Sequence, residues 1–180
     1  MHGVVSLLDS RHAELVKILW QLLEKHCGMN GVMLTPYPHF SWQIAEDYPE
    51  PATETLLKTI SSQCQPLRVR TGGLGVFSGP HPVLFISIIR NEELNRVHKY
   101  IWQKFQKSAK GRSPFYAPPS WMPHITLAFG DATPRKLSCA VELLASKVFD
   151  WEIEVNNLAF IAQPGDQTGT LKHRYDFLRQ

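Results

Sequence analysis

Apolar residues recur along the chain with two periods, and the alternation between them predicts a mixture of strands and helices. Helical spacing of apolar residues predicts four helices: one around 15–23, one from Pro51 to near Cys64, one over 94–105 and one over 137–148. Gly28 is placed to end the first helix, and Asn91 or a neighbour to cap the third. The Gly72-Gly73 pair predicts a hairpin. Alternating or continuous apolar runs predict strands over 3–8, 32–35, 39–44, 67–69, 75–77, 83–89, 124–129, 151–161 and 173–178.

The order of these elements is similar in the two halves of the chain. Each half contains a strand that follows a proline, then a helix, then further strands. This order predicts an α+β fold in which two pseudo-symmetric lobes form one domain over residues 1–180. We expect the lobes to be centred on residues 31–90 and 115–165.

Two tetrapeptides with the same pattern of residue types are the strongest indication of function in the sequence. They are His39-Phe40-Ser41-Trp42 and His124-Ile125-Thr126-Leu127, and a proline precedes each histidine. Side chains alternate along a strand, so each histidine shares a face with the hydroxyl residue two positions later. At 43% hydrophobic content, His-apolar-Ser/Thr-apolar is expected by chance roughly 0.2 times in such a chain. Two copies, each after a proline, therefore indicate a function.

The paired motifs suit chemistry at a phosphodiester. Cleavage needs a base for the attacking oxygen and an acid for the leaving oxygen, and imidazole can do either near neutral pH. Hydroxyl groups two residues away can donate hydrogen bonds to the non-bridging oxygens. Two hydroxyls among four motif side chains, without Cys or carboxylate at ligand spacing beside them, predict no metal and no cofactor.

Composition narrows the class of protein. Hydrophobic residues make up 43% and charged residues 19% of the chain, as in a globular protein. The formal charge of +3 is too small and scattered to indicate nucleic-acid binding by itself. Cys27, Cys64 and Cys139 lack paired or metal-type spacing, which predicts free thiols in a reducing compartment. The early apolar run Val4–Leu8 is too short for a signal peptide or a membrane span, so we expect a cytoplasmic protein.

With these motifs, the chain resembles the 2H phosphoesterases, the superfamily of the 2′-5′ RNA ligase and cyclic phosphodiesterase proteins. The glycine-rich segment 72–77, the apolar strand 83–89 and the closing strand 175–178 extend the resemblance over nearly the whole chain. The resemblance implies a cleft between two antiparallel sheets with outer helices, with one motif on each wall and no required metal. It assigns His39 and His124 as the acid and base pair, and Ser41 and Thr126 as phosphate ligands.

Other residues are weaker candidates for contact with substrate. Tyr37, Tyr116 and Trp121 lie just before a motif or in the loop leading into one, where an aromatic ring can stack on a nucleobase. His173 and Tyr175 share a face of the closing strand, and in related proteins a late strand can reach the cleft. Basic side chains that could hold flanking phosphates are Arg68, Arg70, Lys172 and Arg174.

The sequence thus predicts a metal-independent phosphoesterase that acts on RNA or nucleotide 2′,3′-cyclic phosphates or on 2′-5′ linkages. Its partner would be an RNA end or a small nucleotide, and we expect a monomer that does not bind membranes. One alternative is a module that binds nucleotides or RNA 3′ ends without turnover. Another is an α+β interaction protein whose motifs are coincidental, which predicts no cleft that joins the two motif strands.

Overall fold

The computed structural model describes residues 1–178 and confirms the α+β class. Its helices are α1 (Ser10–Cys27), α2 (Ala52–Ser61), α3 (Glu92–Lys104) and α4 (Pro134–Leu144), with short 3₁₀ turns η1 (Gly31–Leu34) and η2 (Pro114–Tyr116). Its strands are β1 (His2–Leu7), β2 (His39–Ala45), β3 (Leu67–Phe77), β4 (Val83–Ile88), β5 (His124–Ala128), β6 (Glu152–Val155), β7 (Asn157–Ala162) and β8 (Thr170–Asp176).

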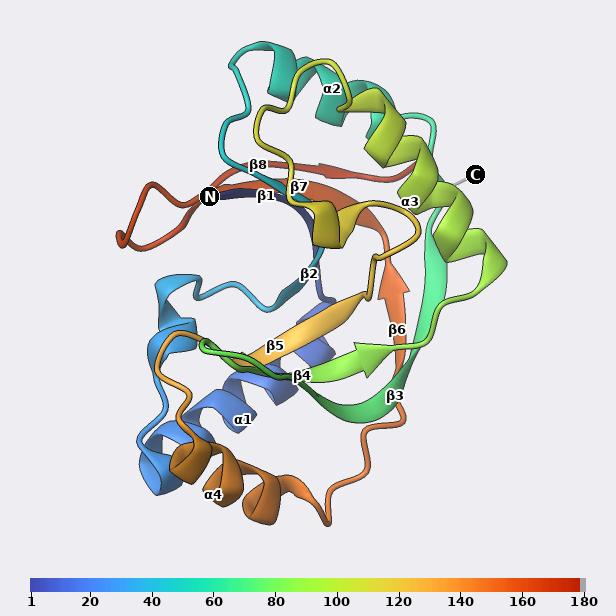
Figure 1. The fold of residues 1–180 in the computed structure, drawn as a ribbon. Helices are drawn as coiled ribbons and strands as arrows, with labels where there is room; N and C mark the ends of the chain where they lie inside the picture. The colour runs from blue at the N-terminus through green and yellow to red at the C-terminus, as the bar shows by residue number, and fades with distance from the viewer. Residues whose placement is uncertain (179–180) are drawn as a thin grey trace.

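The strands of the described chain form one sheet in the order β6-β3-β4-β5-β2-β1-β7-β8. All of its pairings are antiparallel. The two motif strands β2 and β5 meet at its centre through the pair Phe40 and Ile125. The sheet bends there, with β1, β7 and β8 above the bend and β3, β4 and β5 below it (Figure 1). This bend is compatible with the predicted two lobes.

The halves of the sheet do not follow the ranges 31–90 and 115–165. Strands β3 and β4, which come from the first range, lie beside β5. Strand β7, which comes from the second range, lies between β1 and β8. Each half is therefore assembled from both parts of the chain, although β2, β5 and β6 lie in the halves that these ranges predict.

The helices cover one face of the bent sheet. Helices α2 and α3 lie above it and α1 and α4 below it, on the outer side of the bend (Figure 1). The main core cluster contains Phe40, Trp42, Ile125 and Leu127, each at most 1% exposed. These four residues alternate with the motif histidines and hydroxyls, so they anchor the motif strands in the core. The opposite face carries a small apolar cluster around Val5, Ala159 and Ile161.

Three predicted elements need correction. Residues 31–34 form the 3₁₀ turn η1 rather than a strand. The Gly72-Gly73 pair lies inside β3, at an irregularity where the strand changes partner from β6 to β4, and Gly73 has φ 99°. The predicted strand 151–161 is two strands, β6 and β7, which lie in different halves of the sheet.

The helix ends follow the local signals in the sequence. Gly28 ends α1 in the left-handed conformation, with φ 64°, and its backbone N–H donates to the Glu24 carbonyl. Asn91 caps α3, where its side chain accepts a hydrogen bond from the Leu94 N–H. Both predicted ends are confirmed.

The prediction of three free thiols is wrong. Cys27 at the end of α1 and Cys139 on α4 form a disulfide, with their Cα atoms 5.8 Å apart. Cys64 is free and buried. The disulfide could not be recognised from sequence spacing, because the packing of α1 against α4 brings the two cysteines together. The expectation of a reducing compartment therefore loses this support. Within residues 1–178, no helix is long and apolar enough to cross a bilayer.

Candidate active site

The four motif side chains gather where the two halves of the sheet join. Strands β2 and β5 run antiparallel through the Phe40–Ile125 pair. One step to either side of that pair therefore brings His39 toward Thr126 and Ser41 toward His124. The histidines lie on one diagonal of this patch and the hydroxyls on the other. Such diagonal neighbours have Cα atoms about 7–8 Å apart, a separation that leaves space for a phosphate between two imidazoles.

The same kind of hydrogen bond, to a backbone carbonyl two residues earlier, holds both imidazoles. Nδ1 of His39 lies 2.5 Å from the Tyr37 carbonyl oxygen, and Nδ1 of His124 lies 2.6 Å from the Met122 carbonyl oxygen. A carbonyl can only accept, so Nδ1 carries the proton and donates it in each ring. The Nε2 atom of each neutral ring is therefore left as the proton acceptor. The proline before each histidine belongs to this turn, because the accepting carbonyl precedes it directly.

Burial disfavours the protonated, charged form of both the His39 and the His124 ring. Desolvation lowers the pKa of His39, the hydrogen bond from Nδ1 to Tyr37 opposes this shift, and a charge on His124 lowers the pKa further. Desolvation also lowers the pKa of His124, against its hydrogen bond to Met122. The interaction between the rings means that a proton on His124 disfavours a second proton on His39. The pair is thus suited to hold one proton at a time, which acid–base catalysis requires.

Two indole N–H groups fix the backbone of the motif strands. Nε1 of Trp20, on α1, donates to the Thr126 carbonyl at 3.0 Å. Nε1 of Trp121 donates to the Ser41 carbonyl at 2.9 Å. Each bond reaches the residue that carries a motif hydroxyl, so the core helps to set the position of both hydroxyls. Sequence patterns gave no sign of these contacts, because they join residues 80 or more positions apart.

Tyr116 and Tyr37 lie on the Ser41 and His39 side of the patch. Burial raises the pKa of Tyr116 to about 12, and a hydrogen bond with the Ser41 side chain opposes that rise. The Tyr116 phenol therefore stays protonated beside Ser41 at neutral pH. Tyr37 supplies the carbonyl that holds His39, and its side chain packs with the small apolar cluster on the motif face.

Aromatic rings that the sequence analysis missed surround His124. The Phe77 ring packs edge to face against the His124 ring with centroids 5.0 Å apart, and the Phe85 ring lies at 5.1 Å. Gly75 makes room for the Phe85 ring, because a Cβ there would lie 2.5 Å from that ring. The apolar run that predicts the strand containing Phe85 was visible in the sequence. Its register against His124 was not.

Three of the weaker candidates lie away from the motif face. The Trp121 side chain is 0% exposed and stacks on His98 with centroids 3.8 Å apart, so it supports the site from the core. His173 pairs across the sheet with Phe160, and Tyr175 with Leu158. Phe160 and Leu158 belong to the main core beneath the helices, which places His173 and Tyr175 on the face opposite the motif patch.

Three of the predicted basic residues are paired with carboxylates. Arg68 contacts Glu152 at 2.6 Å and Arg70 contacts Asp150 at 2.5 Å. Arg174 contacts Asp176 at 2.9 Å. Because their charges are paired, Arg68, Arg70 and Arg174 do not extend the motif patch as a continuous basic surface.

Comparison with known protein families shows which superfamily the chain belongs to. The model of the 2′-5′ RNA ligase superfamily matches residues 19–167, a range that includes both motifs. The chain belongs to this superfamily. The resemblance to the 2H phosphoesterases stated from the sequence is therefore confirmed. A search of curated protein sequences gives no match.

Solved structures share the fold of this superfamily member. TT0787 of Thermus thermophilus is 20% identical, with a TM-score of 0.66 over 98% of this chain and 97% of that one. A phosphoesterase and E. coli LigT complexed with 3′-AMP are each 13% identical, with TM-scores of 0.59 over 99% of this chain and 98% of theirs. At these identities, the comparisons establish the fold.

Proposed function

We propose that the protein is a phosphoesterase that cleaves RNA or nucleotide 2′,3′-cyclic phosphates or 2′-5′ linkages by two-histidine acid–base catalysis. The observation that carries this proposal is the matched pair of imidazoles at the join of the sheet. Each is fixed through Nδ1 by a carbonyl two residues earlier, and each shares a strand face with a hydroxyl. Membership of the 2′-5′ RNA ligase superfamily supports the same reaction class.

Hydrolysis of a cyclic phosphate illustrates the roles. Nε2 of the neutral histidine takes a proton from water as the water oxygen bonds to phosphorus. Nε2 of the protonated histidine gives its proton to the ribose oxygen that leaves, so the P–O bond breaks and the ring opens to a phosphomonoester. Because His39 and His124 present the same atom, the direction of the reaction decides which is base and which is acid.

Ser41 and Thr126 would stabilise the charge that develops on the non-bridging oxygens. One positioned donor of this kind can contribute about 3 kcal/mol to transition-state stabilisation. The Tyr116 phenol is placed beside Ser41, where it can orient the Ser41 hydroxyl. The Trp20 and Trp121 indoles limit movement of the strands that carry the two donors.

A small or terminal phosphate fits this surface better than a long nucleic acid. The net charge is only +3, and Arg68, Arg70 and Arg174 are engaged with carboxylates. Phe77 is partly exposed beside His124, where its ring can contact a nucleoside. E. coli LigT, which shares the fold, was solved with 3′-AMP, and a nucleoside phosphate ligand is compatible with this proposal.

The test uses adenosine 2′,3′-cyclic phosphate and a 2′-5′ linked dinucleotide as substrates, with EDTA present and products identified by chromatography. We expect turnover by the native protein and a loss of about 10²–10⁴-fold in kcat for His39→Ala and for His124→Ala. His81→Ala, at an exposed position, is the matched control. Substantial turnover by either motif variant would refute the assignment. Tight binding of the substrates without turnover by the native protein would instead support the alternative of a binding module.

A further inference from the structure

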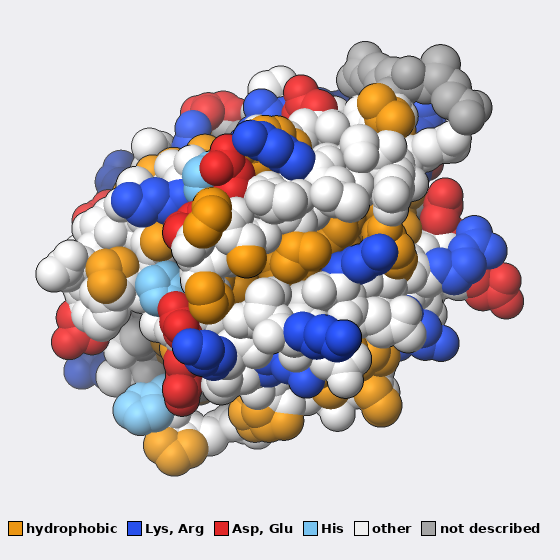
Figure 2. Space-filling model, turned by 90° about the horizontal axis from the view of Figure 1, so that it is seen from above, with side chains coloured by type: hydrophobic (Ala, Val, Ile, Leu, Met, Phe, Trp, Pro, Cys, Tyr) orange, Lys and Arg blue, Asp and Glu red, His pale blue; other side chains and the backbone are white. Residues whose placement is uncertain are grey.

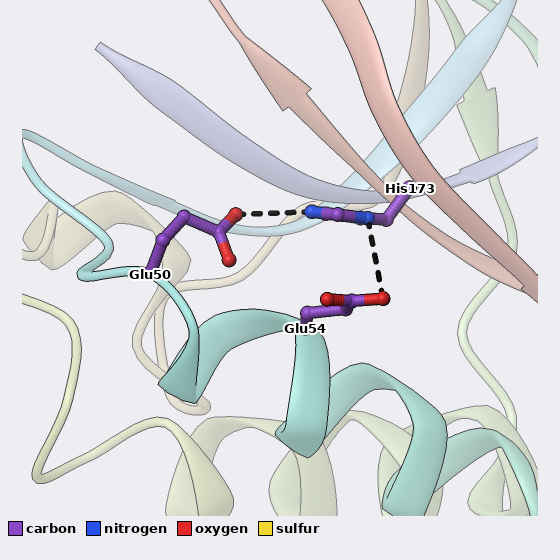
Figure 3. A group of neighbouring side chains, drawn as sticks. All are labelled: Glu50, Glu54 and His173. Atoms are coloured by element: carbon purple, nitrogen blue, oxygen red, sulfur yellow. Dashed lines mark hydrogen bonds and ion pairs between the residues drawn. The ribbon is translucent and has the colours of Figure 1, made fainter.

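Glu50, Glu54 and His173 form a compact polar cluster on the face of the sheet opposite the motif patch. Glu50 lies in the loop before α2, Glu54 in the first turn of α2 and His173 on β8. The two carboxylates point from the loop and the helix toward the same imidazole (Figure 3). Within residues 1–178, these side chains can each offer one ligand atom with all three atoms within 4.8 Å of one another.

The ligand atoms of the cluster are close enough for one ion to bridge them after a small side-chain movement. Nε2 of His173 lies 3.0 Å from Oε1 of Glu50. Nitrogen and oxygen ligands about 2.1 Å from one ion are about 3.4 Å apart at the tetrahedral angle, so this pair has to open slightly. Glu54 faces the other ring nitrogen, with its Oε1 3.9 Å from Nδ1 of His173. The Glu50 side chain is 48% exposed, so its rotation can bring both carboxylates to one ring nitrogen.

Neighbouring groups orient Glu54 without using all of its ligand capacity. Oε1 accepts hydrogen bonds from the Tyr175 hydroxyl at 2.7 Å and from Lys58 Nζ at 2.8 Å. These contacts lower the pKa of Glu54, so it is ionised at neutral pH. In the described part of the chain all of these contacts use Oε1, which leaves Oε2 available to an ion. Partners of this kind commonly hold carboxylate ligands in place.

A hollow next to the cluster leaves room for the remaining ligands of an ion. Glu50 and His173 line a surface cavity of about 410 Å³ together with His2, Asp47 and Lys172. His2 is a poor ligand, because its Nδ1 accepts a hydrogen bond from the Gln163 N–H and Nε2 must then carry the proton. Acidic and basic side chains are mixed over this face of the molecule, so the cluster is not part of a broad acidic patch (Figure 2).

We propose that Glu50, Glu54 and His173 bind one divalent transition metal ion of the zinc type, with water in its open positions. One imidazole and two carboxylates are suitable ligands for such ions. The ion would tie the start of α2 and the preceding loop to β8. It would act as a structural clamp, since the cluster lies across the sheet from His39 and His124.

The test is a titration of metal-free, tag-free protein with Zn²⁺ by calorimetry, and with Co²⁺ by visible absorption. We expect one saturable equivalent and a Co²⁺ spectrum that reports nitrogen and oxygen ligands. At a hundredfold excess of Zn²⁺ over Kd, the Tm should rise by roughly 5 °C or more. His173→Ala should abolish binding. Glu50→Gln, at a half-exposed position, should weaken it at least tenfold without threatening the fold.

Matched controls separate the cluster from adventitious binding. His81→Ala removes an exposed loop histidine, and His2→Ala removes the histidine next to the N-terminal amine, so both should bind Zn²⁺ like the native protein. Absence of a saturable equivalent, unchanged binding in both cluster variants, or loss of binding in His2→Ala would overturn the proposal. Cyclic phosphate turnover in EDTA is measured separately, so failure of the metal site leaves the proposed reaction untouched.

Discussion

Replacement of Trp121 by phenylalanine tests whether the core positions the motif strand. The Trp121 side chain is fully buried, packs against Trp42 and His98, and donates its indole N–H to the Ser41 carbonyl at 2.9 Å. Phenylalanine can keep the stacking but cannot donate. The variant therefore removes one hydrogen bond and the atoms of the fused five-membered ring.

The magnitude follows from these two losses. A buried carbonyl left without its partner costs about 1–3 kcal/mol. The space vacated by the smaller ring adds about 1 kcal/mol. We therefore expect Trp121→Phe to lower the free energy of unfolding by about 2–4 kcal/mol. For a chain of 180 residues, this corresponds to a fall in Tm of roughly 5–15 °C.

Urea unfolding followed by circular dichroism measures the change, with Trp102→Phe as the matched control. Trp102 is partly buried, and its indole N–H makes no hydrogen bond within residues 1–178. The control should lose about 1 kcal/mol or less. Equal losses in the two variants would refute the reasoning that the bond to Ser41 anchors β2.

Further predictions concern pH and thiols. Because desolvation lowers the pKa of both motif histidines, kcat/KM for cyclic phosphate should peak below pH 6.5 and fall on either side, and a maximum above pH 7 would contradict this. Burial lowers the pKa of His98 from 6.5 to about 4, so its contribution to stability is complete above pH 6.5 and declines as the pH falls toward 4, by roughly 3 kcal/mol in all. Urea unfolding between pH 7 and 4 should show this decline, and His98→Gln should flatten it; an unchanged slope would oppose it. Titration of thiols in unfolded, unreduced protein should find one reactive group, Cys64, and three after reduction, whereas three before reduction would refute the Cys27–Cys139 bond.

Local features of this fold could be predicted because their causes lie within a few residues. Strand alternation placed His39 and Ser41 on one face and Phe40 in the core, and the structure agrees. The end of α1 at Gly28 and the cap of α3 at Asn91 also depend on short-range geometry.

Features set by register or helix packing could not be predicted in this way. The sequence did not show that β2 and β5 are neighbours, because that pairing depends on the whole sheet. The position of Phe77 beside His124 depends on how β3, β4 and β5 are aligned. The same limit applies to the partner change inside β3, where glycines that resemble a turn allow an irregular strand instead.

The interleaved order of the strands also affects how the protein tolerates shortening. Strand β1 needs β7 as its outer neighbour, and the first part of β3 needs β6. A chain cut before residue 152 would expose unpaired edges on both halves at once, although both histidine motifs would still be present. His39 and His124 are thus synthesised before the strands that complete the sheet around them, and fragments that carry both motifs but lack these strands should aggregate.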